Sequence, residues 1–455
     1  MDKILLLLIL PILLCCKKTA EEVGSVIEVP IEIEDGFGPF SANFSIFNAE
    51  YTADNPDGAG WIPTYRPVRG VPKKWEGVVK SMIWLDGYQL VYQNFHEGKI
   101  NKEMYESLQK SWNWVPDETA LSKKPLKCFV YTVRGRDETG KIAVMVDTNN
   151  NLDFSDETAF YPEKIYLNEG KYEWDSVRVY KKVFMVQREH VLRGEVVKDS
   201  IPMIIKYAPD DEKWKRFWYA FPRYGKARFD WKGKEHEMVV NNFFTHAGFE
   251  ESNIFVEKGL DPKKRLAVMD GVEKGELIEV GGLLDKSKFR NLGVDPRTGS
   301  LLLQAESADL DEYSLQKGYA MRPFKAKEFK TGKDIALADF RGKYVFIDFW
   351  GTWCGPCVQQ LPALREIYKE TNKNQVQFIG IVKDTEERLD KYLTKNNLEW
   401  PQILSDSVNK LIETYKITGY PTTILLGPDG RVVDRNIHGE ALKTRLKAIS
   451  AGPVL

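Results

Sequence analysis

The chain has 455 residues, of which 43% are hydrophobic and 29% are charged, and its 65 Lys and Arg nearly balance its 66 Asp and Glu. This length is too great for one ordinary hydrophobic core, so we expect about two to four domains. The hydrophobic content excludes a wholly disordered chain, and the net charge of -1 gives no electrostatic indication of nucleic-acid binding.

The N-terminus resembles a bacterial lipoprotein signal. An apolar run from Ile4 to Leu14 ends at Cys15 and Cys16; it is too short to cross a bilayer but fits the apolar part of a signal peptide. The peptidase of such signals requires a small residue before the lipidated cysteine, and Cys15 suits that position better than Leu14 does. We therefore predict a signal peptide over 1–16 with lipid on Cys16, which anchors the protein to a membrane on the periplasmic side of a bacterial cell envelope. A simple secretory signal and an uncleaved anchor are the alternatives.

The next three hundred residues have a β-rich pattern. Residues 17–25 are polar and predict a tether. From there to residue 318, short runs rich in Val, Ile, Tyr and Phe alternate with Gly, Asp and Asn, which is typical of strands and turns. We expect two β-rich modules, at 26–195 and 196–318. The predicted strands are 128–133, 142–146, 177–186, 201–207 and 277–280, with a hairpin at 293–303 and one helix at 101–112 that has Met104, Leu108 and Trp112 on one face.

One segment of this region has oxygen ligands at alternate positions, as a calcium loop does. It runs from Asp147 to Asp156 and continues to Glu157, but Leu152 and Thr158 stand where the EF-hand pattern has Gly and Glu. A hairpin turn rich in Asn and Asp explains the segment equally well, so both interpretations stay open.

Two other features of the region favour packing over function. Cys128 lies in an expected strand and is interpreted as an inert core thiol. The aromatic stretch Trp214–Tyr224 favours core packing and surface rings over a binding surface.

The pattern changes after an acidic linker at 306–318. Strand and helix signals alternate from there on, which predicts a largely parallel α/β domain over 319–455. The whole chain is therefore expected to be multidomain, with β-rich modules first and an α/β domain last. The predicted strands are 344–350, 376–382, 422–426 and 432–435, and the predicted helices are 354–370, 385–395, 407–415 and 441–448.

A Cys-Gly-Pro-Cys segment marks the chemistry of this last domain. The strand 344–350 delivers Cys354 to a helix N-terminus, where unpaired N–H groups and the helix dipole stabilise a thiolate, the nucleophile of disulfide exchange. Cys357 follows one turn later, spaced to attack the resulting mixed disulfide. Gly355 and Pro356 form the loop between them, and the N–H that proline lacks is not needed in a first helical turn.

The same segment is the wrong pattern for a metal site. Zinc requires two more Cys or His at suitable spacing, and neither Cys128 nor the five His of the chain supplies a second pair. The Cys354–Cys357 dithiol is therefore expected to be the redox group, with no metal and no other cofactor.

The segment Trp353–Cys357 resembles the active site of thioredoxins. Asp348 lies six residues before Cys354, where thioredoxins keep a buried carboxylate, and Pro362 lies eight residues after it, at the kink of their active-site helix. The segment Gly419–Thr423 resembles the cis-proline loop of the family. The lead-in at 323–343 and the extra helix and strand at 385–404 are similar to the TlpA/ResA branch, whose members are membrane-tethered, extracytoplasmic disulfide reductases.

The resemblance implies a thioredoxin fold and a role for several side chains. It implies that Trp353, Tyr420 and Pro421 contact the substrate and that Asp348 accepts a proton from Cys357. The alternative for Asp348 is a carboxylate at the exposed end of its strand.

Two positions depart from the pattern of the family. Gln360 stands three residues after Cys357, where some members of the branch have a functional Glu. The strand 376–382 has no Lys, and Lys383 comes only at its end. These departures concern the proton transfer and leave the exchange chemistry as predicted.

We therefore predict a lipid-anchored disulfide reductase of the cell envelope. Its expected partners are disulfide-containing proteins and a membrane electron donor that recharges the dithiol. Two alternatives stay open: a disulfide oxidase or isomerase, and a ligand-binding lipoprotein in which the redox domain is an accessory.

Overall fold

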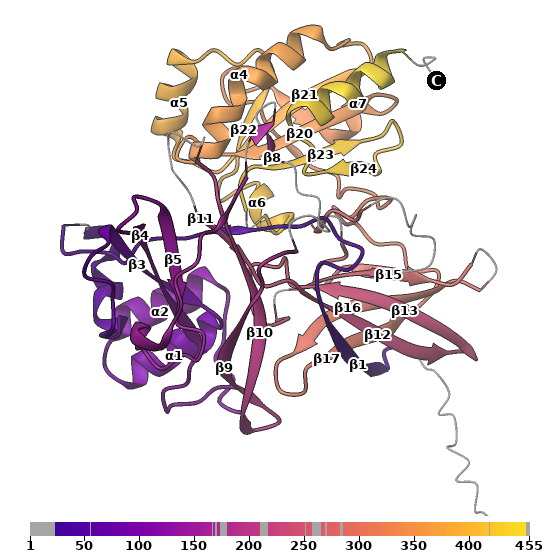
Figure 1. Ribbon diagram of the computed structural model, residues 1–455. Coiled ribbons are helices and arrows are strands. Elements are labelled where there is room, and N and C mark those ends of the chain that lie inside the picture. Colours follow the sequence, from indigo (N-terminus) through magenta and orange to yellow (C-terminus); the bar gives the residue numbers. More distant parts are fainter. Residues whose placement is uncertain are drawn as a thin grey trace, which may run out of the picture. The chain divides into compact units, whose positions relative to one another are not determined.

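The computed structural model describes residues 23–451 except 55, 166, 169–170, 173–179, 210–216, 251, 257–264, 269–270, 283–284 and 418. It divides into two compact units, Met1–Ala308 and Asp309–Leu455 (Figure 1). The predicted signal peptide over 1–16, with Cys16, lies outside the described residues. Within the described ranges, no helix is both long and apolar enough to cross a membrane.

The N-terminal unit contains a seven-stranded antiparallel sheet built around β1 (Val26–Asp35). Its first half pairs with β17 and its second half with β12. Ile27, Val29 and Ile31 alternate with outward-facing residues and pack into the core of this sheet, as the two-residue period of a strand requires. The other strands are β12 (Arg223–Trp231), β13 (Lys234–Asn241), β14 (Asn253–Val256), β15 (Leu277–Val280), β16 (Ser287–Asp295) and β17 (Ser300–Glu306).

Two further sheets complete the core of this unit. One runs in the order β2-β11-β10-β6, with β9 paired to β10, and the other in the order β3-β4-β5. Apolar side chains from both, among them Ile83, Val144 and Met203, form one buried cluster. The strands are β2 (Ser45–Ile46), β3 (Glu76–Trp84), β4 (Phe129–Arg136), β5 (Ile142–Val146), β6 (Glu163–Lys164), β9 (Phe184–Leu192), β10 (Glu195–Tyr207) and β11 (Phe217–Ala220), with a small β7 (Leu167–Asn168) and β8 (Lys171–Tyr172) pair.

Among the residues described in this unit there are two α-helices, and the sequence predicted one of them. The helix α2 (Lys102–Ser111), capped by Asn101, confirms that prediction, and Met104, Leu108 and Trp112 pack on one apolar cluster. The helix α1 (Gly87–His96) was not predicted, although Asp86 caps it by accepting a hydrogen bond from the Gln89 N–H at 2.8 Å. Two segments of tighter 3-10 helix are η1 (Pro56–Thr64), of nine residues, and η2 (Phe154–Asp156), of three.

The prediction of two separate β-rich modules is wrong. The boundary at 195 falls in the hairpin between β9 and β10, where Glu195 pairs with Leu192. The strand β1, assigned to the first module, lies in the sheet formed by strands of the second. Pairing between strands so distant in sequence leaves no local signal along the chain. Of the predicted strand 177–186, residues 177–179 lie outside the described residues, and β9 begins at Phe184.

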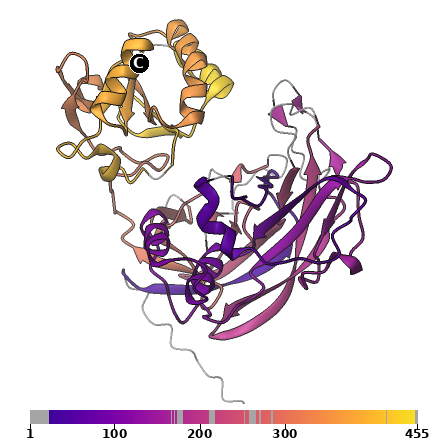
Figure 2. The same cartoon turned by 90° about the vertical axis from the view of Figure 1, so that its left-hand side faces the viewer.

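The C-terminal unit is built on a five-stranded sheet in the order β22-β21-β20-β23-β24 (Figures 1 and 2, orange to yellow). The sheet is mixed, which corrects the expected largely parallel one. The strands β20, β21 and β22 pair in parallel, whereas β23 pairs antiparallel with β20, and β24 pairs antiparallel with β23. Its strands are β20 (Tyr344–Trp350), β21 (Val376–Val382), β22 (Gln402–Leu404), β23 (Thr422–Leu426) and β24 (Val432–Arg435), preceded by a β18 (Lys325–Lys327) and β19 (Asp334–Ala336) hairpin and the turn η4 (Leu337–Phe340). The helices are α4 (Gly355–Glu370), α5 (Glu386–Lys395), α6 (Leu411–Thr414) and α7 (Gly439–Ala451).

The boundary of this unit lies at 308/309, earlier than the predicted 318/319. The Val432 N–H donates to the Tyr319 carbonyl at 2.9 Å, and Ala320 forms an isolated bridge with Arg431. The Gly318 N–H also donates to the Val432 carbonyl at 2.8 Å, so backbone contacts attach the end of the expected linker to β24.

Alternation along β20 separates two cores. Phe346 and Trp350 pack with Leu361 and Leu364 of α4 on one face of the sheet. Ile347 and its odd-numbered neighbours pack in a different cluster on the other face. Asp348 shares the parity of Phe346 and Trp350, so its side chain lies on the α4 face.

The helix α6 is shorter than predicted. It starts at Leu411 instead of 407 because the Asp406 side chain accepts hydrogen bonds from the Val408 and Asn409 N–H groups and forms a turn there. Val408, expected to point inward, is 89% exposed.

Candidate active site

The two cysteines of the C-terminal unit lie at the start of α4 and form a disulfide. Cys354 is the N-cap residue, and its Sγ accepts a hydrogen bond from the Cys357 N–H at 3.2 Å. An N-cap sulfur next to free helical N–H groups is placed where negative charge is stabilised. Cys354 keeps 5% of its surface exposed, whereas Cys357 is completely buried. An incoming disulfide can therefore reach the first sulfur more easily than the second.

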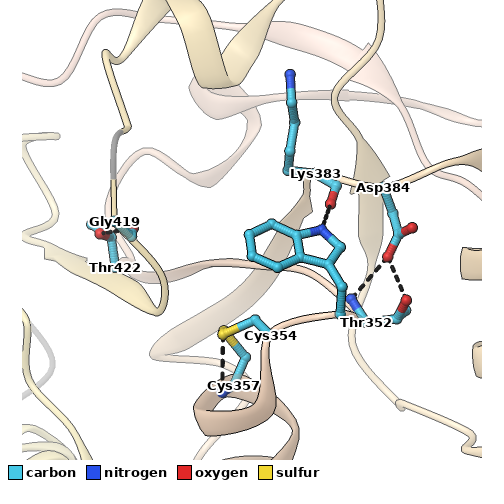
Figure 3. Close-up of a disulfide and its surroundings, with 8 residues drawn as sticks. Thr352, Cys354, Cys357, Lys383, Asp384, Gly419 and Thr422 are labelled. Atoms are coloured by element: carbon cyan, nitrogen blue, oxygen red, sulfur yellow. Dashed lines mark hydrogen bonds between the residues drawn. A yellow bond between two sulfur atoms is a disulfide. The ribbon is translucent and has the colours of Figure 1, made fainter. Parts of the chain in front are cut away.

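The residues before the disulfide are held by the end of the neighbouring strand (Figure 3). The Trp353 indole N–H donates to the Lys383 carbonyl at 2.8 Å. The Thr352 N–H and hydroxyl both donate to Asp384 Oδ2, at 2.8 and 2.5 Å. These three bonds fix the loop that carries Cys354, although Trp353 itself is 54% exposed.

The loop before β23 borders the same surface. The Tyr420–Pro421 peptide bond is cis. The ring of Tyr420 lies edge-on to that of Trp353, with centroids 5.3 Å apart. The Thr422 hydroxyl donates to the Gly419 carbonyl at 2.8 Å and closes the turn. The residues predicted to contact substrate, Trp353, Tyr420 and Pro421, thus lie together beside the disulfide.

Asp348 is a buried carboxyl group without a partner. Its side chain is 1% exposed, and neither of its oxygens has a hydrogen-bond partner among the described residues. Burial alone raises the pKa of Asp348 to about 7. This position does not fit the alternative of a carboxylate at an exposed strand end. A group with this pKa on the α4 face can take or give a proton near neutral pH.

Gln360 and Lys383, the two residues that depart from the thioredoxin pattern, have different surroundings. Gln360 lies on α4 one turn after Cys357, and its Nε2 is buried without a partner among the described residues. Lys383 points elsewhere, because its Nζ pairs with Glu413 Oε1 at 2.7 Å. Among the described residues, no cation therefore offsets the burial that raises the pKa of Asp348.

The segment Asp147–Asp156 forms a turn closed by its own hydrogen bonds. The two oxygens of Asp147 accept from the Asn151 and Leu152 N–H groups at 2.9 Å each. The side chains of Asn149 and Asn151 both donate to Asp156 Oδ2. Across the ranges that the structure describes, no group of three acidic, His or Cys side chains is arranged to hold a metal ion.

Cys128 is buried in the N-terminal unit, where burial raises its thiol pKa well above the ordinary value. Of the aromatic stretch 214–224, Trp214 lies outside the described residues, whereas Phe217 and Phe221 are buried in a core cluster.

Two residues that support the site were not predicted from the sequence. Asp384 holds Thr352, and the Gln402 Oε1 accepts from the Trp350 indole N–H at 3.0 Å. Gln402 also fills the space next to Gly380, where a Cβ atom would lie 2.0 Å from its Oε1. The sequence signal for Asp384 was its position just after the carboxyl end of β21, a strand parallel to β20.

A strand that ends in a two-cysteine helix start, next to a cis-proline loop on a mixed five-stranded sheet, defines a thioredoxin-fold dithiol–disulfide protein. Residues 318–435 match the model of the AhpC/TSA family. The thiol-disulfide oxidoreductase ResA of a Bacillus cereus strain is 38% identical over 117 residues, which cover 26% of this chain and 66% of that protein. The chain thus spans slightly less than two thirds of that relative.

Two other similar proteins are also named thiol-disulfide oxidoreductases. ResA of Geobacillus thermodenitrificans is 31% identical over 122 residues, which cover 26% of this chain and 70% of that protein. The crystal structure of the thioredoxin domain of a thiol-disulfide oxidoreductase from Bacteroides vulgatus is 30% identical, covering 30% of this chain and 98% of that one, with a TM-score of 0.28. Through its C-terminal unit, the chain belongs to the ResA family of thiol-disulfide oxidoreductases.

Proposed function

We propose that this protein is a lipid-anchored protein-disulfide reductase that works outside the cytoplasm. The observation that carries the proposal is the Cys354–Cys357 pair at the start of α4, with the less buried sulfur capping the helix. The names of the ResA relatives support thiol–disulfide exchange as the reaction.

The first step is attack by Cys354. In the reduced protein its thiolate attacks one sulfur of a substrate disulfide, a mixed disulfide forms, and the other substrate sulfur leaves as a thiolate. Trp353 and the Tyr420–Pro421 loop border Cys354 and are proposed to hold the substrate backbone while this occurs.

The second step is resolution by Cys357. Its thiol first loses a proton, which we assign to the Asp348 carboxylate, because the pKa of Asp348 is raised to about 7 and its oxygens have no other described partner. The Cys357 thiolate then attacks Cys354 Sγ, the mixed disulfide breaks, and the substrate leaves fully reduced. The intramolecular disulfide of the structure is the oxidised product of this turnover. A membrane donor of two electrons restores the dithiol.

The residues between the cysteines favour reduction as the direction of the exchange. The Gly355-Pro356 pair is that of reducing thioredoxins, whose potential is about −270 mV, against about −120 mV for a strong oxidase. A redox titration of the full chain is expected to give a potential nearer the first value. A potential near the second would make the protein an oxidase.

The anchor is proposed from the sequence, at Cys16. Cys16→Ala is expected to release the protein from membranes or to block its maturation. Cys15→Ala is the matched control and is expected to be tolerated, because Ala also suits the position before cleavage. A Cys16→Ala protein that is processed normally and stays on the membrane contradicts the lipid anchor.

Trapping tests the reaction and finds the substrates. Cys357→Ser leaves attack possible and removes resolution, so mixed disulfides through Cys354 should accumulate in the native membrane fraction. Cys354→Ser should accumulate almost none. Equal trapping by the two variants would contradict the roles assigned to the two sulfurs.

A further inference from the structure

The N-terminal unit contains a cavity of about 750 Å³ that lies within this unit alone. It is bordered by β3, the edge strand of the three-stranded sheet, and by β2, the edge strand of the five-stranded sheet. The segment after β2 follows β3, because the Glu50 N–H donates to the Lys80 carbonyl at 3.1 Å. Small-molecule sites have volumes of about 300–1,000 Å³, so the cavity has the size of a ligand site.

Aromatic rings form much of its wall. Trp61 and Trp84 contact each other with ring centroids 4.8 Å apart, and Tyr88 lies edge-on to Trp112 at 5.7 Å. All four side chains are half-buried. Their contacts come from η1, β3, α1 and the end of α2, so rigid elements hold the rings in place while part of each ring stays accessible.

The wall carries three carboxylates, and His246 is the one basic side chain among the described residues that line it. Glu50, Asp86 and Glu250 line the cavity, and none of the described residues that line it is Lys or Arg. The Glu50 Oε2 pairs with Lys80 at 2.9 Å, whereas its Oε1 has no hydrogen-bond partner among the described residues, although the side chain is only 12% exposed. A buried carboxylate oxygen without a donor is costly unless a ligand supplies one.

The Glu250 carboxylate places a second negative charge near Asp86. Burial, together with the nearby Glu250 carboxylate, raises the pKa of Asp86 to about 6. Arg188 acts in the opposite direction, but its guanidinium is engaged by Asp199 at 2.7 Å. A positive charge in the cavity would relieve the repulsion between the carboxylates.

We propose that this cavity binds an organic cation: an alkylammonium or guanidinium group carried by a small molecule or by a peptide side chain. Such a group pairs with the carboxylates that line the cavity. It also lies against the faces of Trp61, Trp84 and their neighbours through cation–π attraction. A neutral sugar also stacks on such rings but leaves the negative charge uncompensated. This site is separate from the dithiol and goes beyond the proposed reductase activity.

The test compares a cation with a neutral molecule of the same shape. Dissociation constants are measured for the full chain by ligand-observed NMR, with n-pentylammonium, n-pentanol, maltose and a blocked Ala-Lys-Ala peptide as probes. We expect n-pentylammonium to bind at least tenfold more tightly than n-pentanol and maltose. Peptide binding at or above the affinity of the amine identifies a side chain as the source of the cation, and weaker peptide binding identifies a small molecule. Equal binding of the amine and the alcohol, tighter binding of maltose, or no binding of either cation would overturn the proposal.

Two variants connect the binding to the wall. Glu50→Gln is expected to weaken n-pentylammonium at least fivefold and to leave n-pentanol unchanged. The exposed Glu250→Gln is also expected to weaken the binding of n-pentylammonium, and it takes the place of Glu50→Gln in the test if that variant does not fold. Glu138→Gln, on the surface and paired with Lys74, is the matched control and should change nothing. Unchanged affinity in both cavity variants contradicts the proposal, whereas disulfide reduction by the full chain stays intact in all of them.

Discussion

The two units of the chain differ in how far apart in sequence their contacts lie. In the C-terminal unit the central strand β20 is followed directly by α4 and pairs with β21, the next strand in the chain. In the N-terminal unit β1 pairs with β12 and β17, strands that come far later in the sequence. The functional side chains of the C-terminal unit are brought together by short connections. Those of the N-terminal unit come together only once its sheets have formed. Chemistry is therefore easier to recognise in the sequence of the C-terminal unit.

The largest expected effect separates the two units by their cysteines. Cys354→Ser should reduce catalysed disulfide reduction ~10³-fold or more, because the nucleophile is lost. Cys128→Ser, the buried thiol of the N-terminal unit, should leave the rate unchanged. Insulin reduction by the full chain measures both. Loss of activity in the Cys128→Ser variant would contradict the assignment of the redox chemistry to the C-terminal unit.

The next effect concerns stability. Val29 of β1 is 1% exposed, and Val29→Asp buries an unpaired charge in the seven-stranded sheet, at a cost of about 3–5 kcal/mol. Hydrogen exchange should rise in peptides of the N-terminal unit and stay unchanged in 309–455. Ile379→Ala, in the core of the C-terminal unit, should raise hydrogen exchange in 309–455 and leave the N-terminal unit unchanged, at a cost of about 2–5 kcal/mol in stability. Joint loss of protection in both units would show that they do not behave as separate cores.

A third prediction concerns Asp348. Asp348→Asn keeps the size of the side chain and removes the base, so resolution should slow by up to ~10²-fold, mostly below about pH 8, with partial recovery as external base takes over. Stopped-flow reduction of a model disulfide measures this. A wild-type rate throughout the neutral range would make Asp348 structural.

The stability of the same variant gives an independent test. Because the pKa of Asp348 is raised to about 7 in the folded chain, its ionisation costs stability progressively as the pH rises from its unfolded pKa to about 7. Urea unfolding should therefore show Asp348→Asn more stable than wild type at about pH 8, with the difference disappearing near about pH 4. A clear loss of stability at the higher pH would contradict the uncompensated burial.

The smallest effect concerns the loop that carries the nucleophile. Asp384→Ala removes the acceptor of both Thr352 hydrogen bonds and is expected to cost about 1–2 kcal/mol and to slow exchange several-fold. The exposed Asp390→Ala on α5 is the control and should have no effect. Equal effects of the two variants would mean that the bonds to Thr352 do not position the dithiol.

The sequence predicted what depends on neighbours in the chain. The strand 344–350, the helix that starts at the Cys354 segment and the helix 101–112 all follow from periodicity within a few positions. The single N-terminal unit could not be predicted in this way, because the place of β1 depends on partners that only the folded sheet brings near.

The same difference applies within the sites. Asp348 was placed by its spacing from Cys354, but Gln402 and Asp384 act through contacts between strands, which spacing does not show. The cation cavity combines η1, β3 and the loop that holds Glu250, so no motif in the sequence indicated it.

The most direct test of the central claim is the alkylation of the reduced full chain by iodoacetamide, followed by peptide mapping across pH. We expect Cys354 to take the label first, with an apparent pKa lowered from the ordinary value of about 8.5 towards the value of about 7 known for thioredoxin. The buried Cys357 should react far more slowly. First labelling at Cys357, or labelling of Cys354 with an ordinary thiol pKa, would contradict it.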